Sequence, residues 1–217
     1  ASLFVPKGET LFQVEYKNGA KDVIESENSS PFSFPVAILV DDGSASASEI
    51  VAAAVQETTD IPIVGIKTFG KGTVQTAKNL DDGSNLKYTS AKWLTPEGNW
   101  INEKGVKPDV TVELPDYAKL TYISPDEQLS VGTNTADTKT AELMLEAVGY
   151  SPGKADGVFD ESTKAAVSKL QKDAGLEVTG VLTGDTTMLL MQKLSEKIQE
   201  NDTQLEKATQ IVLEQLK

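Results

Sequence analysis

The sequence predicts an α/β unit followed by a small all-helical module and a C-terminal helix. Before residue 115, apolar runs typical of strands surround one helical segment, and after residue 138 apolar residues recur at helical spacing. The stretch between them is rich in proline and polar residues, which is typical of a connector. We therefore expect the protein to divide into an α/β unit at 1–115, a connector at 116–137, the helical module at 138–198 and the C-terminal helix at 199–217.

The α/β unit is predicted to open with a β-hairpin. Residues 11–16 and 22–25 have strand-like composition, and the Asn-Gly pair in the turn at 17–20 is a strong hairpin signal. The continuous apolar run at 36–40 predicts a strand buried on both faces. A helix follows at 49–57, and further strands are predicted at 61–66, 73–77 and 86–93.

The module after residue 138 is predicted to contain three helices. Leu143, Leu145 and Val148 have helical spacing in the first, and 163–173 and 186–198 form the second and third. The last residues form a polar helix with one apolar stripe. That stripe needs a surface to cover, either on this protein or on another copy of it; its members are Leu205, Ala208, Val212 and Leu216.

The composition excludes several kinds of chemistry. The 217-residue chain has no histidine and no cysteine, so Ser-His-Asp, Cys-His and thiolate or histidine metal sites are ruled out within it. All 20 basic residues are lysine, so bidentate guanidinium clamps are absent. A net charge of −13 argues against nucleic acid and anionic membranes as partners. We expect no metal and no organic cofactor, and we interpret the acidic pairs Asp41-Asp42 and Asp81-Asp82 as turns.

The segment from Ser44 to Ser48 lies where a predicted strand gives way to a helix. A helix N-terminus offers free backbone N–H groups, which suit a developing oxyanion. Without histidine, only a lysine, a carboxylate or the chain terminus could activate a serine. A lysine can do so if burial lowers its pKa from about 10.4 toward neutrality. Lys71 is a candidate because it sits between two glycines that let the backbone bend close to another segment.

The same residues also have a purely structural interpretation. Ser44, Ser46 and Ser48 could each cap the helix, with Glu49 supporting a capping box. A Gly-Lys-Gly sequence such as the one around Lys71 is commonly a surface turn. Residue chemistry alone therefore does not decide whether this is a catalytic site, or which of the three serines would be the nucleophile.

Two motifs together resemble the carboxyl-terminal (tail-specific) processing proteases of family S41. They are Gly43-Ser-Ala-Ser-Ala-Ser-Glu49 and Thr68-Phe-Gly-Lys-Gly-Thr-Val-Gln75. The resemblance covers roughly residues 1–115 and includes Thr95-Pro-Glu-Gly and the closing Gly-Val-Lys-Pro-Asp-Val. It implies part of a ClpP/crotonase-like α/β core and a serine endopeptidase that cleaves proteins near their C-termini.

The resemblance also assigns roles to individual residues. It implies Ser46 as the nucleophile, Lys71 as the general base, Gln75 as the residue that orients the lysine, and the Ala47 N–H as one oxyanion donor. In the family, a glycine that gives the second oxyanion N–H and a substrate-capturing PDZ domain lie before the region that this sequence matches. We therefore expect this chain alone to be poorly active or inactive. The first residues also lack a signal-peptide pattern, so we expect a processed form or a fragment.

Two other functions stay open at this point. One is a non-catalytic fragment that serves cell-wall attachment or assembly through the helical module. The other is a crotonase-like protein acting on acyl thioesters, which the Ser46–Lys71 pairing and the lack of a nucleotide-binding signature disfavour.

The helical module resembles a peptidoglycan-binding repeat of the three-helix type. The matching pieces are Gly149-Tyr150, Gly153, Asp156-Gly-Val-Phe159, Thr163, Ala166-Val167, Leu170-Gln171, Gly175-Leu176 and Gly180-Val-Leu. Most of these residues specify a fold, so glycan or stem-peptide binding and a spacer or dimerisation role both stay open. The expected partners are substrate C-termini, peptidoglycan and a second copy in a homodimer, in an extracytoplasmic bacterial location.

Overall fold

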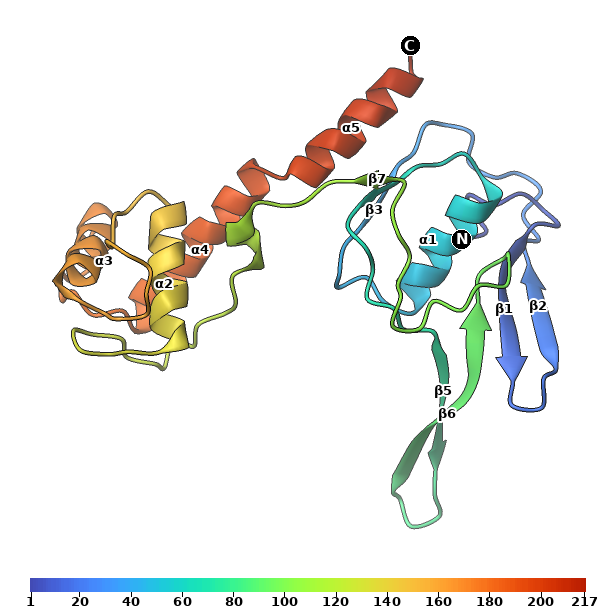
Figure 1. Cartoon of the computed structure of the whole chain (residues 1–217), viewed down its shortest axis with the longest axis horizontal. Helices are drawn as coiled ribbons and strands as arrows, with labels where there is room; N and C mark the ends of the chain where they lie inside the picture. The colour runs from blue at the N-terminus through green and yellow to red at the C-terminus, as the bar shows by residue number, and fades with distance from the viewer. The chain divides into compact units, whose positions relative to one another are not determined.

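The computed structural model describes residues 1–217 as two units. The first contains Ala1–Glu113 together with Gln204–Lys217, and the second contains Leu114–Thr203. Figure 1 shows the sheets of the first unit around the helix Ala47–Thr58, and helices without a sheet in the second unit. The predicted fold class, an α/β core followed by a three-helix module and a C-terminal helix, is confirmed.

An antiparallel sheet forms one side of the first unit. Its strand order is β2-β1-β6-β5, and its strands are β1 (Thr10–Tyr16), β2 (Lys21–Glu25), β5 (Thr73–Asn79) and β6 (Asn85–Leu94). Gly19 has φ 83° in the predicted β1–β2 turn, a conformation that glycine adopts without steric cost. The β5–β6 hairpin extends beyond the rest of its unit (Figure 1).

A short parallel sheet forms the other part of this unit. Its order is β3-β4-β7, with β3 at Ile38–Val40, β4 at Ile63–Gly65 and β7 at Val110–Thr111. The prediction of a strand buried on both faces at 36–40 is wrong, because Leu39 is 42% exposed. Only three residues of this run pair with β4, and β3 is an edge strand, so it has one neighbouring strand and not two.

Helix α1 (Ala47–Thr58) packs against these sheets through small side chains. Ala52, Ala53, Ala54 and Val55 are all buried. Three consecutive alanines let the helix backbone approach its neighbours closely on more than one face. The rest of this core is Val5, Leu11, Val40, Ile63, Trp93, Ile101 and Val106.

Three helices and a short 3₁₀ turn form the second unit. They are α2 (Ala136–Ala147), α3 (Glu161–Asp173), α4 (Gly184–Glu200) and η1 (Asp116–Lys119). The stretch that we predicted as a connector contributes to this unit's core through Ile123 and Leu129. The helices supply Ala141, Met144, Leu145, Ala166, Val167, Leu170, Leu190 and Leu194, and the loops add Tyr150, Phe159 and Leu182.

Buried polar side chains hold the loops of the second unit in place. Glu142 is fully buried and accepts hydrogen bonds from the Gly157 N–H and the Thr163 hydroxyl, both at 2.9 Å. Gln171 likewise accepts the Gly180 N–H at 2.9 Å. Gly157, Thr163, Gln171 and Gly180 belong to the motif pieces that resemble a peptidoglycan-binding repeat, and the structure gives them a role in folding.

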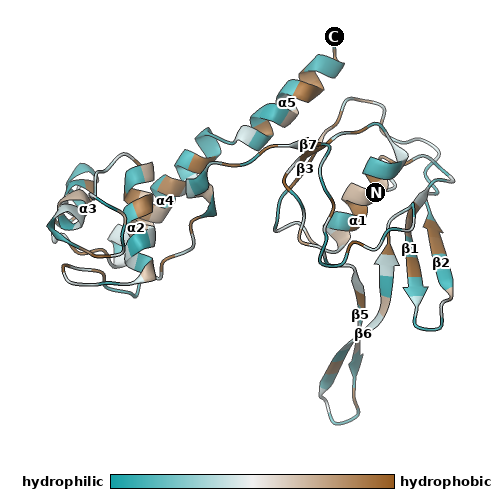
Figure 2. Cartoon of the chain, in the orientation of Figure 1, coloured by the Kyte–Doolittle hydropathy of each residue, from teal (hydrophilic) through white to brown (hydrophobic).

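Helix α5 (Thr203–Gln215) returns to the first unit. The Gln204 side-chain amide donates to the Val112 carbonyl at 2.9 Å, and Ala208 is buried. Figure 2 shows apolar and polar residues alternating along this helix. The predicted stripe is therefore divided, because Ala208 is covered whereas Leu216 remains exposed. No helix in the structure is both long and apolar enough to cross a membrane.

Candidate active site

Ser46 occupies the N-cap position of α1 in an unusual backbone conformation. Its φ is 56° and its ψ is −112°, in a region that non-glycine residues rarely adopt. Holding such a residue costs about 1–3 kcal/mol, so the surrounding contacts must enforce it. A serine on a strained turn into a helix is also how other hydrolases expose a nucleophile. Ala47 begins the helix, and its N–H has no acceptor within the helix.

The side chain that enforces this turn is Glu49, one turn further along α1. It is fully buried, and its Oε2 accepts the Ser46 N–H at 2.9 Å and the Lys71 N–H at 2.8 Å. Its Oε1 accepts the Thr68 hydroxyl at 2.5 Å and the Gly70 N–H at 2.6 Å. One carboxyl group thus joins the backbone of the serine turn to the backbone of the lysine segment.

The segment that carries Lys71 depends on glycine for its close approach to a neighbouring loop. Gly70 has φ 92°, and a Cβ there would lie 2.9 to 3.0 Å from the backbone nitrogens of Glu103, Lys104 and Gly105. The Gly70 carbonyl in turn accepts the Glu103 N–H at 2.8 Å. This packing confirms the expectation that glycine lets the backbone next to Lys71 bend close to another segment.

One pocket brings three of the four predicted site residues together, and Ala47 is not part of its lining. Ser46, Lys71 and Gln75 line a cavity of about 440 Å³. Much of its wall is apolar, with Phe12, Val14, Ile50, Val74 and Trp93, and Thr73 and Lys87 complete the lining. No hydrogen bond joins the Ser46 hydroxyl, the Lys71 amine and the Gln75 amide to one another in this structure, so the pocket gathers these groups without fixing their side chains.

Sequence reasoning missed the part that Glu49 plays. The sequence pattern suggested only a capping box, and the Ser46 N–H bond to Glu49 agrees with that interpretation. The three further bonds come from residues 19 to 22 positions away, so no local pattern could reveal them. The available signal was the occurrence of an acidic residue at a helix position whose neighbours are all apolar or small.

The fold and the sequence together define the class of this protein. Residues 1–112 match the family described as "Peptidase family S41", and the chain belongs to that family. Residues 134–190 match the family described as "Putative peptidoglycan binding domain". The α/β unit is therefore a peptidase core, and a peptidoglycan-binding-type domain follows it.

Among curated proteins, the chain is similar to carboxy-terminal processing proteases of Bacillus subtilis (strain 168). It is 48% identical to CtpA over 216 residues, which is 100% of this chain and 46% of CtpA. It is 40% identical to CtpB over 94% of this chain and 43% of CtpB. The chain thus spans less than half the length of these relatives.

Solved structures are also similar to parts of this chain, at lower sequence identity. The photosystem II D1 C-terminal processing protease is 37% identical over 52% of this chain and 30% of that chain, with a TM-score of 0.48. The N-terminal domain of SleB is 26% identical over 34% of this chain and 99% of that chain, with a TM-score of 0.32.

Proposed function

We propose that this protein is a serine endopeptidase that cleaves protein substrates near their C-termini, with Ser46 as nucleophile and Lys71 as general base. The observation that supports this most directly is the shared pocket of the two residues, whose backbones are bonded to one carboxyl oxygen of Glu49. Gln75 would orient the lysine, and the Ala47 N–H would stabilise the oxyanion.

The proposed reaction proceeds through an acyl-enzyme. The Ser46 hydroxyl oxygen attacks the scissile carbonyl, and its proton passes to the Lys71 amine, which acts as the base. The tetrahedral oxyanion collapses, the C–N bond breaks, and the leaving amine takes the proton from Lys71. Water then attacks the ester in the same way and releases the new C-terminus from Ser46.

A serine-reactive acylating probe tests this proposal directly. We expect covalent modification of Ser46 and of no other serine, because only a serine with an adjacent base is a strong nucleophile at neutral pH. Peptide mass mapping of wild type and Ser46→Ala measures it, and Ser44→Ala is the matched control because Ser44 lies in the same motif. Equal labelling of the Ser46→Ala variant would overturn the assignment of the nucleophile.

Residues 1–217 alone are proposed to turn over peptides slowly or not at all. The chain aligns with only 46% of CtpA, and that family is expected to draw its second oxyanion N–H and its substrate-capturing domain from the remainder. Without this N–H group and this domain, the binding energy that they would supply cannot stabilise the transition state. A side-by-side peptide-cleavage assay with CtpA tests this, and comparable turnover by residues 1–217 would contradict it.

The helical unit is proposed to bind peptidoglycan, which would place the enzyme outside the cytoplasm of a bacterium. The family match at 134–190 supports this, although the motif residues that the structure explains are structural. We expect the protein to sediment with purified insoluble cell wall. We also expect soluble wall fragments to release it from the pellet. Absence from the pellet at low and moderate salt would favour a spacer or dimerisation role.

A homodimer is proposed through the exposed side of α5. Leu213 on this helix and Leu216 in the turn directly after it are 55% and 64% exposed, whereas Ala208 is buried. Adjacent exposed leucines on a surface helix gain free energy when a second apolar surface covers them. Light scattering should give a mass of about twice 23.2 kDa, and Leu213→Glu with Leu216→Glu should give the monomer mass. A wild-type monomer at high concentration would refute the dimer.

A further inference from the structure

The backbone of Lys71 is bonded on both of its polar groups. Its N–H donates to Glu49 Oε2 at 2.8 Å, and its carbonyl accepts the indole N–H of Trp93 at 2.8 Å. Trp93 is 1% exposed and belongs to the core of the first unit. These two bonds fix the lysine backbone from the inner side of the sheet.

The backbone of the next residue, Gly72, is held by side chains from a different loop. Its N–H donates to Asn102 Oδ1 at 3.1 Å, and its carbonyl accepts the indole N–H of Trp100 at 3.0 Å. A Cβ on Gly72 would lie 2.8 Å from both Trp100 Nε1 and the backbone nitrogen of Asn102. The glycine is therefore required for the indole to reach the backbone.

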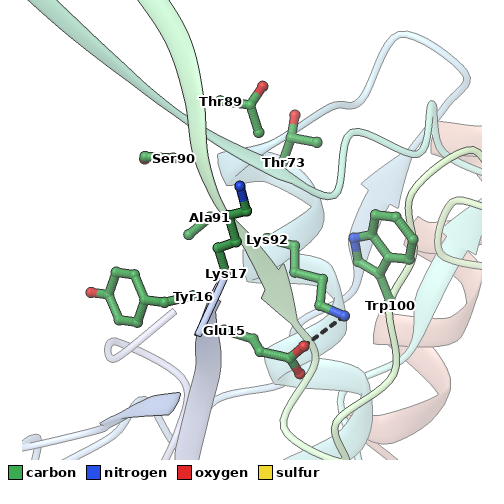
Figure 3. Close-up of a pocket in the computed structure, with 9 residues that line it drawn as sticks. All are labelled: Glu15, Tyr16, Lys17, Thr73, Thr89, Ser90, Ala91, Lys92 and Trp100. Atoms are coloured by element: carbon green, nitrogen blue, oxygen red, sulfur yellow. Dashed lines mark ion pairs between the residues drawn. The ribbon is translucent and has the colours of Figure 1, made fainter. Parts of the chain in front are cut away.

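The Trp100 ring is itself held in place by an ion pair on the outer face of the sheet. Lys92 Nζ lies 5.2 Å from the ring centroid, a distance typical of a cation–π contact. The same amine is 2.7 Å from Glu15 Oε1, and Glu15 and Lys92 are directly opposite on β1 and β6. Figure 3 shows Lys92 between the carboxyl group and the indole. The hydrogen bond with Lys92 lowers the pKa of Glu15, so this carboxyl group stays charged at neutral pH.

Packing alone does not account for this tryptophan. Trp100 is 42% exposed, so it contributes far less to the core than Trp93. Its polar atom points at the carbonyl next to Lys71, and its ring is oriented by a charged pair that lies outside the pocket of Ser46 and Lys71. The clearest effect of Trp100 is therefore to fix the position of the backbone segment that carries Lys71.

We propose that Trp100 is a positioning residue for Lys71, which it holds through the Gly72 carbonyl while Lys92 and Glu15 orient the indole. The inference rests on the proposed function, in which Lys71 is the base. A base must lie within hydrogen-bond reach of the serine proton, and a displacement of about 1 Å lowers rates on the order of 100-fold. Trp100 acts on the geometry of the base and does not touch the substrate.

Trp100→Phe tests the inference because it keeps the ring and removes the donor. In the full-length protein we expect kcat to fall roughly 10- to 100-fold, with KM changed by less than about two-fold. The fold should persist, because the Gly72 carbonyl also accepts the Trp93 backbone N–H at 3.1 Å. Tyr122→Phe, at an aromatic residue 70% exposed in the other unit, is the matched control and should leave both constants unchanged.

Amide hydrogen exchange gives a second readout that does not depend on catalysis. In Trp100→Phe, the Lys71 and Gly72 amides should exchange about 10-fold faster, while those of Ala53 and Ala54 in α1 keep their wild-type rates. Unchanged exchange at Lys71 and Gly72, or an unchanged kcat, would overturn the inference. Cleavage retained by Ser46→Ala would instead overturn the proposed function, and the two failures are distinguishable because the exchange rates are measured without substrate.

Discussion

Replacing Glu49 with glutamine is expected to unfold the first unit at a much lower denaturant concentration and to abolish cleavage. The carboxyl group accepts four hydrogen bonds, two on each oxygen. A glutamine has one acceptor oxygen, so its NH₂ group must face two of these donors. Each buried donor that loses its partner costs about 1–3 kcal/mol, so the free energy of unfolding should fall by about 3 kcal/mol or more.

Tryptophan fluorescence during urea denaturation measures this effect selectively, because both tryptophans, Trp93 and Trp100, lie in the first unit. Glu57→Gln is the matched control: Glu57 lies on the same helix, is half-buried, and accepts one backbone N–H, that of Glu97 at 2.7 Å. Its replacement should cost less than about 1 kcal/mol. A Glu49→Gln protein as stable as wild type would show that the carboxyl group does not hold the two segments together.

Local signals in the sequence were sufficient for much of the fold. The Asn-Gly turn before Ala20 predicts the β1–β2 hairpin, and the helical spacing after residue 138 predicts α2, α3 and α4. The prediction at 36–40 failed because an apolar run shows that a segment is partly buried but not how many strands flank it. That number depends on sheet order, which is a long-range property.

The candidate site was predictable for a different reason. Ser46 and Lys71 were singled out by family motifs, since residue chemistry left three serines open. The network around them was not predictable, because Glu49 and Trp100 reach Lys71 and Gly72 through bonds that span 22 and 28 positions. Such bonds depend on tertiary structure, and the local patterns at Glu49 and Trp100 are compatible with an ordinary helix cap and a surface loop.

Replacing Lys71 with methionine is expected to abolish cleavage while leaving the fold intact. Methionine has an unbranched side chain one atom shorter than that of lysine and cannot accept a proton, so the Ser46 hydroxyl would lose its proposed base. Loss of a nucleophile or its base in serine peptidases costs about 10³-fold or more in kcat. The structural contacts of this segment come from its backbone, through the Glu49 and Trp93 bonds, and these are retained in the variant.

Steady-state cleavage of a reporter peptide by the full-length protein measures the effect, with the urea midpoint as a check on folding. Lys67→Met is the matched control, because Lys67 is an exposed lysine four residues earlier in the same segment. It should retain wild-type kcat and KM. Undiminished cleavage by Lys71→Met would rule out the lysine as base. Because the chain contains no histidine, the proton acceptor would then be a carboxylate, the chain terminus or another lysine, and Lys87 would be the next candidate because it also lines the pocket.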